Sequence, residues 1–194
     1  MVERAIAAIR AGEPVILPTD TVYGLCISPE SAGRLSELKG RADSTPVALL
    51  CADVEALLER VPELAGRPEV GELLPGPYTL VFPNPAGRFP ALGGAGTIGV
   101  RVPVLPAVTH DVLAVAGAVA ATSANLHGGP DSRRLEDVPP EIRACAVVVD
   151  GGELPGVPST VLDLTGPEPK VVREGAVPAV EALELLSAAG RASQ

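Results

Sequence analysis

Aromatic residues and cysteines are scarce in this chain of 194 residues. It has no tryptophan, two phenylalanines and two tyrosines, so aromatic side chains make up 2% of it. Its three cysteines, Cys26, Cys51 and Cys145, lie far apart and form no CxxC pair. An odd number of unpaired cysteines argues against a disulfide framework and against a structural zinc site, and it favours a reducing compartment.

Long apolar runs and an excess of positive charge are also missing. The longest apolar stretch, from Val112 to Ala121, is far shorter than the roughly 20 residues that cross a bilayer. The first turns carry Glu3, Arg4 and Arg10 rather than a signal pattern. The net charge of −9 argues against a protein that wraps nucleic acid, so any anion site must be local. We expect a soluble, cytoplasmic protein without membrane contact.

The hydrophobic content of the chain is sufficient for one compact domain. Hydrophobic residues make up 46% of the chain, which can bury a core without cross-links. The hydrophobic pattern predicts helices near residues 2–10, 28–40, 54–60, 107–116 and 178–189, and strands near 14–18, 47–51, 78–82, 98–102, 118–122, 146–149, 160–164 and 170–173. Several strands follow one another over short connections, which favours a three-layer α/β domain with a mixed sheet. We expect residues 1–190 to form this domain, with long loops at 83–96 and 126–140 and a short tail at 191–194.

Familiar catalytic motifs are absent or misplaced. The segment from Gly94 to Gly99 has the spacing of a dinucleotide-binding loop, but a β-branched run follows it where a helix should begin. No phosphate-binding loop of the G-x-x-x-x-G-K-[ST] type occurs. His110 and His127 have no metal-ligand spacing, and Ser123 lacks the G-x-S-x-G context. These patterns exclude the commonest dehydrogenase, zinc hydrolase and serine hydrolase sites, and we expect no metal held by the protein.

The rarest residue types fall in the polar blocks. The chain has 13 arginines but only two lysines and two asparagines, and Lys39 and Asn125 are among them. Because an ammonium cannot be replaced by the planar guanidinium, a chain rich in arginine could retain Lys39 for chemistry. The alternative is a lysine exposed by chance at a helix end, where a cation suits the helix dipole.

Cations and hydroxyls also gather where strands are expected to end. They are Lys39, Arg41, Thr97, Arg101, Ser123, Asn125, Ser159 and Arg173. Such groups suit a phosphorylated substrate, since phosphoryl and nucleotidyl transfer need an anion to be positioned and its charge neutralised. Alternatively, Arg101 and Arg173 pair with Asp163, Glu174 or another acid, and the serines and Asn125 only shape turns.

Seven ordered blocks make the chain resemble the YrdC-type threonylcarbamoyl-AMP synthases. They are Pro18–Leu25, Lys39–Arg41, Pro75–Thr79, Thr97–Pro103, Thr122–Asn125, Pro158–Val161 and Val172–Gly175. The resemblance implies an α/β domain whose twisted mixed sheet surrounds a concave cavity. It also implies condensation of L-threonine, bicarbonate or CO₂, and ATP with Mg²⁺ to threonylcarbamoyl-AMP and pyrophosphate, which feeds tRNA modification by downstream transfer enzymes.

The resemblance further assigns roles to individual residues. Lys39, Arg41, Ser123 and Asn125 would hold the triphosphate and the reacting carbamate. Thr21, Arg101, Ser123 and Ser159 would hold threonine, with Arg101 as a bidentate partner of its carboxylate. Thr97 and Arg173, with Lys39, Arg41 and Asn125, would contact the nucleotide.

Three departures from the family pattern leave other functions open. Ala42, Thr45 and Leu50 stand where the family commonly has proline, asparagine and histidine. A divergent paralogue that handles another carbamoyl- or acyl-adenylate is therefore the first alternative. The second is an RNA-binding module, although the net charge of −9 favours weak or indirect contact with tRNA.

Overall fold

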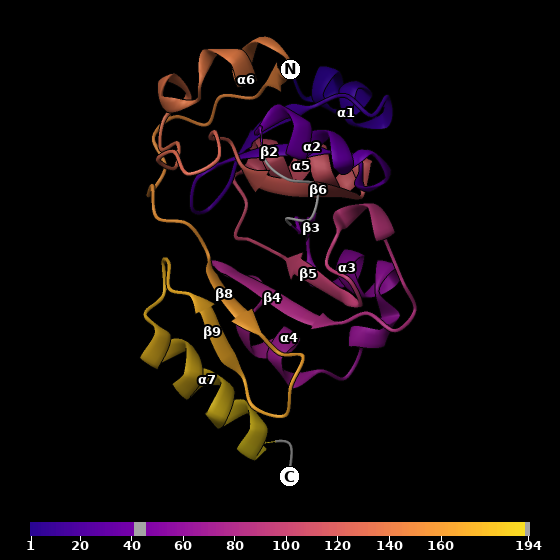
Figure 1. The fold of residues 1–194 in the computed structure, drawn as a ribbon, viewed down its shortest axis with the longest axis vertical. Helices are drawn as coiled ribbons and strands as arrows, with labels where there is room; N and C mark the ends of the chain where they lie inside the picture. Colours follow the sequence, from indigo (N-terminus) through magenta and orange to yellow (C-terminus); the bar gives the residue numbers. More distant parts are fainter. Residues whose placement is uncertain (41–45, 193–194) are drawn as a thin grey trace.

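One nine-stranded sheet forms the centre of the protein (Figure 1). The computed structural model describes residues 1–40 and 46–192, with side chains as far as Ser187. The helices are α1 (Val2–Arg10), α2 (Gly33–Leu38), α3 (Val54–Arg60), α4 (Pro68–Leu73), α5 (Ala107–Ala116), α6 (Pro140–Ala144) and α7 (Ala179–Ala192). The strands are β1 (Val15–Pro18), β2 (Tyr23–Ile27), β3 (Ala48–Cys51), β4 (Tyr78–Pro83), β5 (Thr97–Arg101), β6 (Ala118–Ser123), β7 (Val147–Val148), β8 (Thr160–Asp163) and β9 (Lys170–Arg173).

The sheet is mixed, as the short connections predicted. The strand order is β7-β1-β2-β6-β3-β5-β4-β8-β9. Three neighbouring pairs are parallel, namely β1 with β7, β3 with β5 and β4 with β8, and the other five pairs are antiparallel. Figure 1 shows this order running down the long axis, with α1 near one end and α7 beside β9 at the other.

The central strands put very different side chains on their two faces, because successive residues of a strand point to opposite sides. One face carries Leu49, Leu80, Phe82, Ile98, Val100 and Leu162, which are all buried in the larger apolar cluster. The opposite face carries Ala48, Leu50, Thr79, Val81, Thr97, Gly99, Arg101 and Val161. The first face is a core, and the second is the wall of a hollow.

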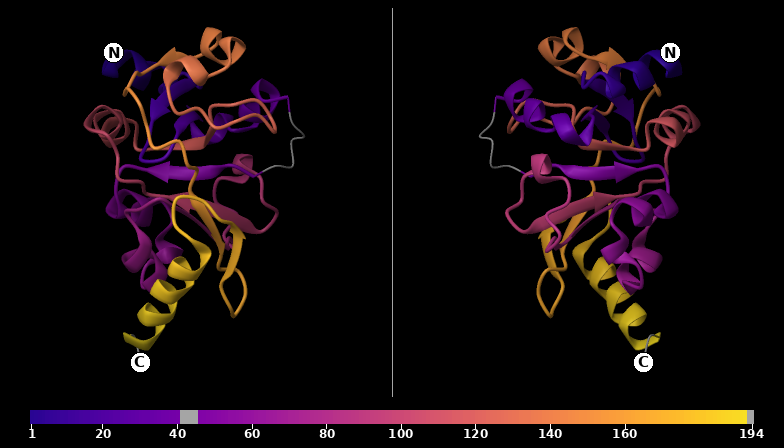
Figure 2. Two further views of the ribbon diagram at one scale, coloured as in Figure 1. Left: turned by 90° about the vertical axis from the view of Figure 1, so that its left-hand side faces the viewer. Right: turned by 90° about the vertical axis from the view of Figure 1, so that its right-hand side faces the viewer.

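Helices cover both sides of the sheet, which confirms the α/β architecture. Side chains of α2, α3, α4, α6 and α7 pack into the larger cluster. Helices α1 and α5 pack on the other side against β1, β2 and β6, through contacts that include Ile9, Val112 and Leu113. That second helical layer does not extend over β4 and β8, whose open face the next section describes. Figure 2 shows the protein from two further sides, with α7 in yellow at the end that carries the C-terminus.

Several elements differ from the sequence-based expectation. Strand β2 was not predicted; it occupies part of the polar block after β1, and all five of its residues are buried, so no alternation marks it. Helix α2 is preceded by a short 3-10 turn, Pro29–Ser31, rather than beginning at Ser28. Helices α4 and α6 are too short to display a helical period.

Candidate functional site

A cavity of about 460 Å³ lies on the open face of the sheet. Its lining comes from β2, β3, β4, β5, β6, β8, β9 and the adjoining connections, and it includes the predicted site residues Thr97, Arg101, Ser123, Ser159 and Arg173. Small residues make the space. Gly99 pairs with both Ala48 and Val81, and Ala48 pairs with Ala121, so one row across four strands contains two alanines and a glycine. The predicted concave cavity is therefore present.

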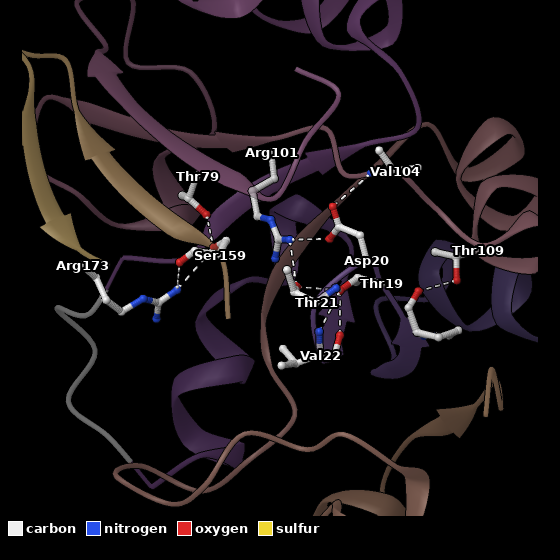
Figure 3. A network of polar contacts seen from close by, with 11 residues as sticks. Thr19, Asp20, Thr21, Val22, Thr79, Arg101, Val104, Thr109, Ser159 and Arg173 are labelled. Atoms are coloured by element: carbon white, nitrogen blue, oxygen red, sulfur yellow. Dashed lines mark hydrogen bonds and ion pairs between the residues drawn. The ribbon is translucent and has the colours of Figure 1, made fainter. Parts of the chain in front are cut away.

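Arg101 enters this cavity from the end of β5 and is paired with an acid. Its Nη2 atom lies 3.1 Å from Oδ1 of Asp20, and the two side chains are 12% and 11% exposed. The same Nη2 donates to the Thr21 hydroxyl at 3.2 Å. Thr21 in turn lies 3.0 Å from the Thr19 hydroxyl. Figure 3 shows Arg101 between this group on one side and Ser159 with Arg173 on the other.

Burial sets the electrostatics of the pair. Burial raises the pKa of Asp20, and the Arg101 charge opposes that rise. Burial also lowers the pKa of Arg101, with the Asp20 carboxylate opposing the change and the neighbouring Arg173 adding to it. A guanidinium remains charged in proteins, so the cavity keeps a cation whose counter-charge is built in. The pairing with an acid that the sequence left open as an alternative is confirmed for Arg101, with Asp20 as the acid.

Arg173 and Ser159 form a second polar group across the cavity. Nη2 of Arg173 donates to the Ser159 carbonyl oxygen at 2.8 Å and lies 3.3 Å from its hydroxyl. The Ser159 hydroxyl is 2.8 Å from that of Thr79. Gly175 allows the chain just after Arg173 to lie close to the backbone at Pro158 and Ser159, because a Cβ at residue 175 would come within 2.2 Å of the Pro158 carbonyl oxygen. In Figure 3 the two contacts drawn for Arg173 run to Ser159.

Lys39 forms the third group and is buried, not exposed as its place after α2 suggested. Only 4% of the residue is accessible. Its Nζ donates to the Ser123 carbonyl oxygen at 2.6 Å and to Oδ1 of Asn125 at 2.7 Å. It also lies 3.3 Å from the Ser123 hydroxyl and 3.5 Å from that of Thr122. Since Thr122 and Ser123 line the cavity, the ammonium adjoins it.

The remaining predicted residues have mixed outcomes. Asn125 is buried behind Ser123, and its Nδ2 donates to the Gly129 carbonyl oxygen at 2.6 Å. Thr97 lines the cavity, and its hydroxyl donates to the Gly94 carbonyl oxygen. Arg41, Ala42 and Thr45 lie outside the described residues. Leu50 is buried in the cavity wall, directly beside Arg101 in the pairing of β3 with β5.

Four members of these groups were not predicted, namely Thr19, Asp20, Thr79 and Thr122. All four stand inside the sequence blocks that carry the resemblance, so the signal was available. Asp20 is flanked by two threonines that were treated as one polar block. Thr79 is two residues before Val81 and therefore on the same face of β4. Strand register brings Thr79 to the site, and the connection between β1 and β2 brings Asp20.

No group of three or more His, Cys, Asp or Glu side chains that could hold a metal ion occurs in residues 1–40 and 46–192. Within the same residues, no helix has the length and apolar character to cross a membrane.

Curated relatives share the sequence over most of its length. The chain is 34% identical over 189 residues to the threonylcarbamoyl-AMP synthase of Pyrococcus abyssi (strain GE5 / Orsay), which covers 91% of the chain and 54% of the relative. The chain thus spans about half the length of that protein. It is also 34% identical over 191 residues to a Mycobacterium tuberculosis protein (strain ATCC 25618 / H37Rv) named as a candidate for the same activity, covering 94% of the chain and 87% of the relative.

Solved structures agree in fold. Sua5 of P. abyssi, solved in complex with L-threonine, superposes with a TM-score of 0.81 at 32% identity over 95% of this chain and 57% of that one. Escherichia coli YciO superposes with a TM-score of 0.77 at 29% identity over 94% of this chain and 92% of that one. The family model Sua5_yciO_yrdC, described as "Telomere recombination", matches residues 7–175. The chain therefore belongs to the Sua5/YciO/YrdC family.

Proposed function

We propose that this protein is a threonylcarbamoyl-AMP synthase, a nucleotidyltransferase that condenses L-threonine, bicarbonate or CO₂, and ATP to threonylcarbamoyl-AMP and pyrophosphate. One observation carries the proposal. Two cationic side chains, Arg101 and Arg173, line one cavity, and the buried ammonium of Lys39 contacts Ser123 in its wall, although the net charge of the protein is −9. Adenylate formation needs this kind of local positive charge, because negative charge grows on the phosphates as the bond to pyrophosphate breaks.

The Arg101 group suits the amino acid. A guanidinium with hydroxyls nearby can bind the threonine carboxylate, and the Ser159 hydroxyl on the far side can accept or donate a further hydrogen bond. Thr21 acts here by fixing the guanidinium, since its hydroxyl already accepts from Nη2. The threonine would then lie over the floor made by Gly99 and Ala48.

The Lys39 group suits the phosphates. Among the described residues, four oxygen atoms of Thr122, Ser123 and Asn125 lie within 3.5 Å of the Lys39 ammonium, so it is positioned before any ligand arrives. Such preorganised donors stabilise charge without reorganising during the reaction. We assign the triphosphate to Lys39 and Arg41, with Ser123 and Asn125 holding the lysine and the carbamate, and the nucleoside to Thr97 and Arg173. Mg²⁺ would enter with the nucleotide.

The reaction then follows in two steps. The threonine amine attacks CO₂ or bicarbonate, and a C–N bond forms with loss of a proton or water to give a carbamate. The carbamate oxygen next attacks the α-phosphorus in line, the new P–O bond forms, and the bond to the β-phosphate breaks to release pyrophosphate. The product is an activated acyl group that tRNA threonylcarbamoyl-transfer enzymes can consume.

A pyrophosphate-release assay tests this proposal directly. The protein is incubated with ATP and Mg²⁺, and threonine and bicarbonate are added separately and together. Release that requires both is the expected result. Release without threonine, or none with all substrates present, would contradict the proposal.

A second candidate rests on Leu50. This apolar side chain adjoins Arg101, where a polar group could otherwise bind the substrate side chain. The same assay with other amino acids and with carbamoyl phosphate distinguishes a paralogue that forms a different acyl- or carbamoyl-adenylate.

A further inference from the structure

Asp20 pairs with a residue of the cavity wall, although the proposed reaction does not require an acid there, since its carboxylate repels both the threonine carboxylate and the phosphates. Its two oxygens are nevertheless both used. Oδ1 lies 3.1 Å from Nη2 of Arg101, and Oδ2 accepts the Val104 backbone N–H at 3.1 Å. Asp20 therefore ties the loop after β1 to the segment after β5, and it does so at the residue we assign to the threonine carboxylate.

The pairing restricts how Arg101 can meet a ligand. Nη2 donates to both Asp20 and Thr21. Nε is buried and has no hydrogen-bond partner among the described residues. A guanidinium binds a carboxylate bidentately through two neighbouring nitrogens, either Nη1 with Nη2 or Nε with Nη2. Nη2 belongs to both pairs, and it already donates to Asp20 and to Thr21. The nitrogen left to face a ligand is Nη1, so a single-nitrogen contact replaces the bidentate pairing expected from the sequence.

We propose that Asp20 is a positioning residue, which holds the Nη2 side of the Arg101 guanidinium and thereby presents Nη1 to the carboxylate of the amino-acid substrate. The inference rests on the proposed function. It goes further by naming the group that orients the threonine-binding cation. Asp20 itself does not touch substrate; it acts through Arg101 and through the backbone at Val104.

The geometry supports orientation over simple charge neutralisation. A mobile guanidinium would be attracted more strongly by the phosphates of the nucleotide than by a carboxylate, because the phosphates carry more charge. Asp20 and Thr21 together fix the plane of the group from one side, while Ser159 and Arg173 lie across the cavity (Figure 3). A fixed cation aimed at the amino-acid end of the cavity keeps the site for the threonine carboxylate apart from the site for the phosphates.

The first test is Asp20→Asn, which keeps an acceptor for the Val104 N–H and removes the charge. We expect the KM for threonine to rise about tenfold, as for loss of one charge-assisted hydrogen bond, with the KM for ATP within about twofold of the wild type. Glu63→Gln is the matched control, because Glu63 forms a 2.7 Å ion pair with Arg88 that lies outside the cavity. It should leave both KM values unchanged.

A double-mutant cycle covers the case in which Asp20→Asn folds poorly with an unpaired buried arginine. Arg101→Met and the double variant Asp20→Asn/Arg101→Met are compared, since the double variant buries neither charge. If Asp20 acts through Arg101, the Asp20 change has no further effect on the threonine KM once Arg101 is methionine. An independent tenfold effect in that background, or equal increases in both KM values for Asp20→Asn alone, would overturn the proposal. Absence of threonine-dependent turnover in the wild type would instead contradict the proposed function itself.

Discussion

The two faces of the central strands differ in composition: one face packs into the apolar core, and the opposite face lines the cavity of the candidate site. On one face, Leu80 and Ile98 are buried in the large apolar cluster. On the other face of the same strands, Thr79, Gly99 and Arg101 line a hollow. A single strand such as β5 thus serves both purposes at alternate residues, so changes at adjacent positions should have different consequences.

The largest expected effect is at the buried lysine that contacts Ser123 in the wall of the open face. Lys39→Ala should lower turnover by about a hundredfold to a thousandfold, as when one preorganised donor is removed from a reacting phosphoryl or acyl centre. The chain offers its own control, because Lys170 is the second lysine and is exposed on β9. Lys170→Ala should retain wild-type turnover. Equal losses in both variants would contradict the role of the buried lysine.

Adjacent substitutions on β4 compare the two faces directly. Leu80→Ala removes a fully buried side chain and should lower the free energy of unfolding by about 2–5 kcal/mol. Thr79→Val loses a hydroxyl contact with Ser159 and should cost about 1 kcal/mol, while it raises the KM for threonine. Denaturant unfolding and steady-state kinetics on both variants check this. A larger stability loss for Thr79→Val than for Leu80→Ala would reverse the comparison.

Gly99→Val fills the hollow without straining the backbone. A Cβ at Gly99 meets its nearest atom, Cγ2 of Thr79, at 3.8 Å, which is ordinary contact. The added methyl groups extend into the cavity, so kcat/KM should fall by about tenfold through misplaced substrates. The melting temperature should change little. A variant that unfolds but retains kcat/KM would show that Gly99 serves packing instead.

Gly71→Ala tests the opposite case, far from the cavity. Gly71 lies inside α4, and a Cβ there meets nothing within 4 Å. Alanine should stabilise the helix by about 0.5–1 kcal/mol, since it restricts the unfolded chain. Thermal unfolding should show a small increase and the assay no change. Loss of activity would link α4 to the site.

The smallest expected effect concerns which of the three cysteines a thiol reagent can modify in the folded protein. Burial raises the pKa of Cys26 and of Cys51 to about 12, so both remain protonated at pH 8 and shielded from reagents. Cys145 is exposed. Native protein at pH 8 should therefore take up one alkyl group per chain and denatured protein three, as mass spectrometry can count. Native labelling of Cys26 would show that the cavity side opens further than the structure implies.

The sequence predicted those elements whose pattern is local. Helices α3 and α5 match the expected ranges, because each is long enough to show a helical period and is preceded by a residue suited to starting a helix, Asp53 and Pro106. Strand β9 also matches. Strand β2 could not be predicted in this way, since both of its faces are buried and its first residues belong to a polar block.

The site was predicted as residue types but not as contacts. The blocks identified Lys39, Arg101, Ser123, Ser159 and Arg173, which the fold does bring together. Burial of Lys39 depends on where the end of α2 meets the end of β6, and the engagement of Arg101 depends on Asp20. Both are long-range packing outcomes, so no local sequence pattern encodes them.

A crystal structure with L-threonine and a non-hydrolysable ATP analogue tests the central claim most directly, because that claim concerns which face of the sheet binds both substrates. The account predicts both ligands on the open face, with the threonine carboxylate against Nη1 of Arg101 and the triphosphate beside Lys39. Threonine bound elsewhere, or a triphosphate away from the lysine, would contradict it.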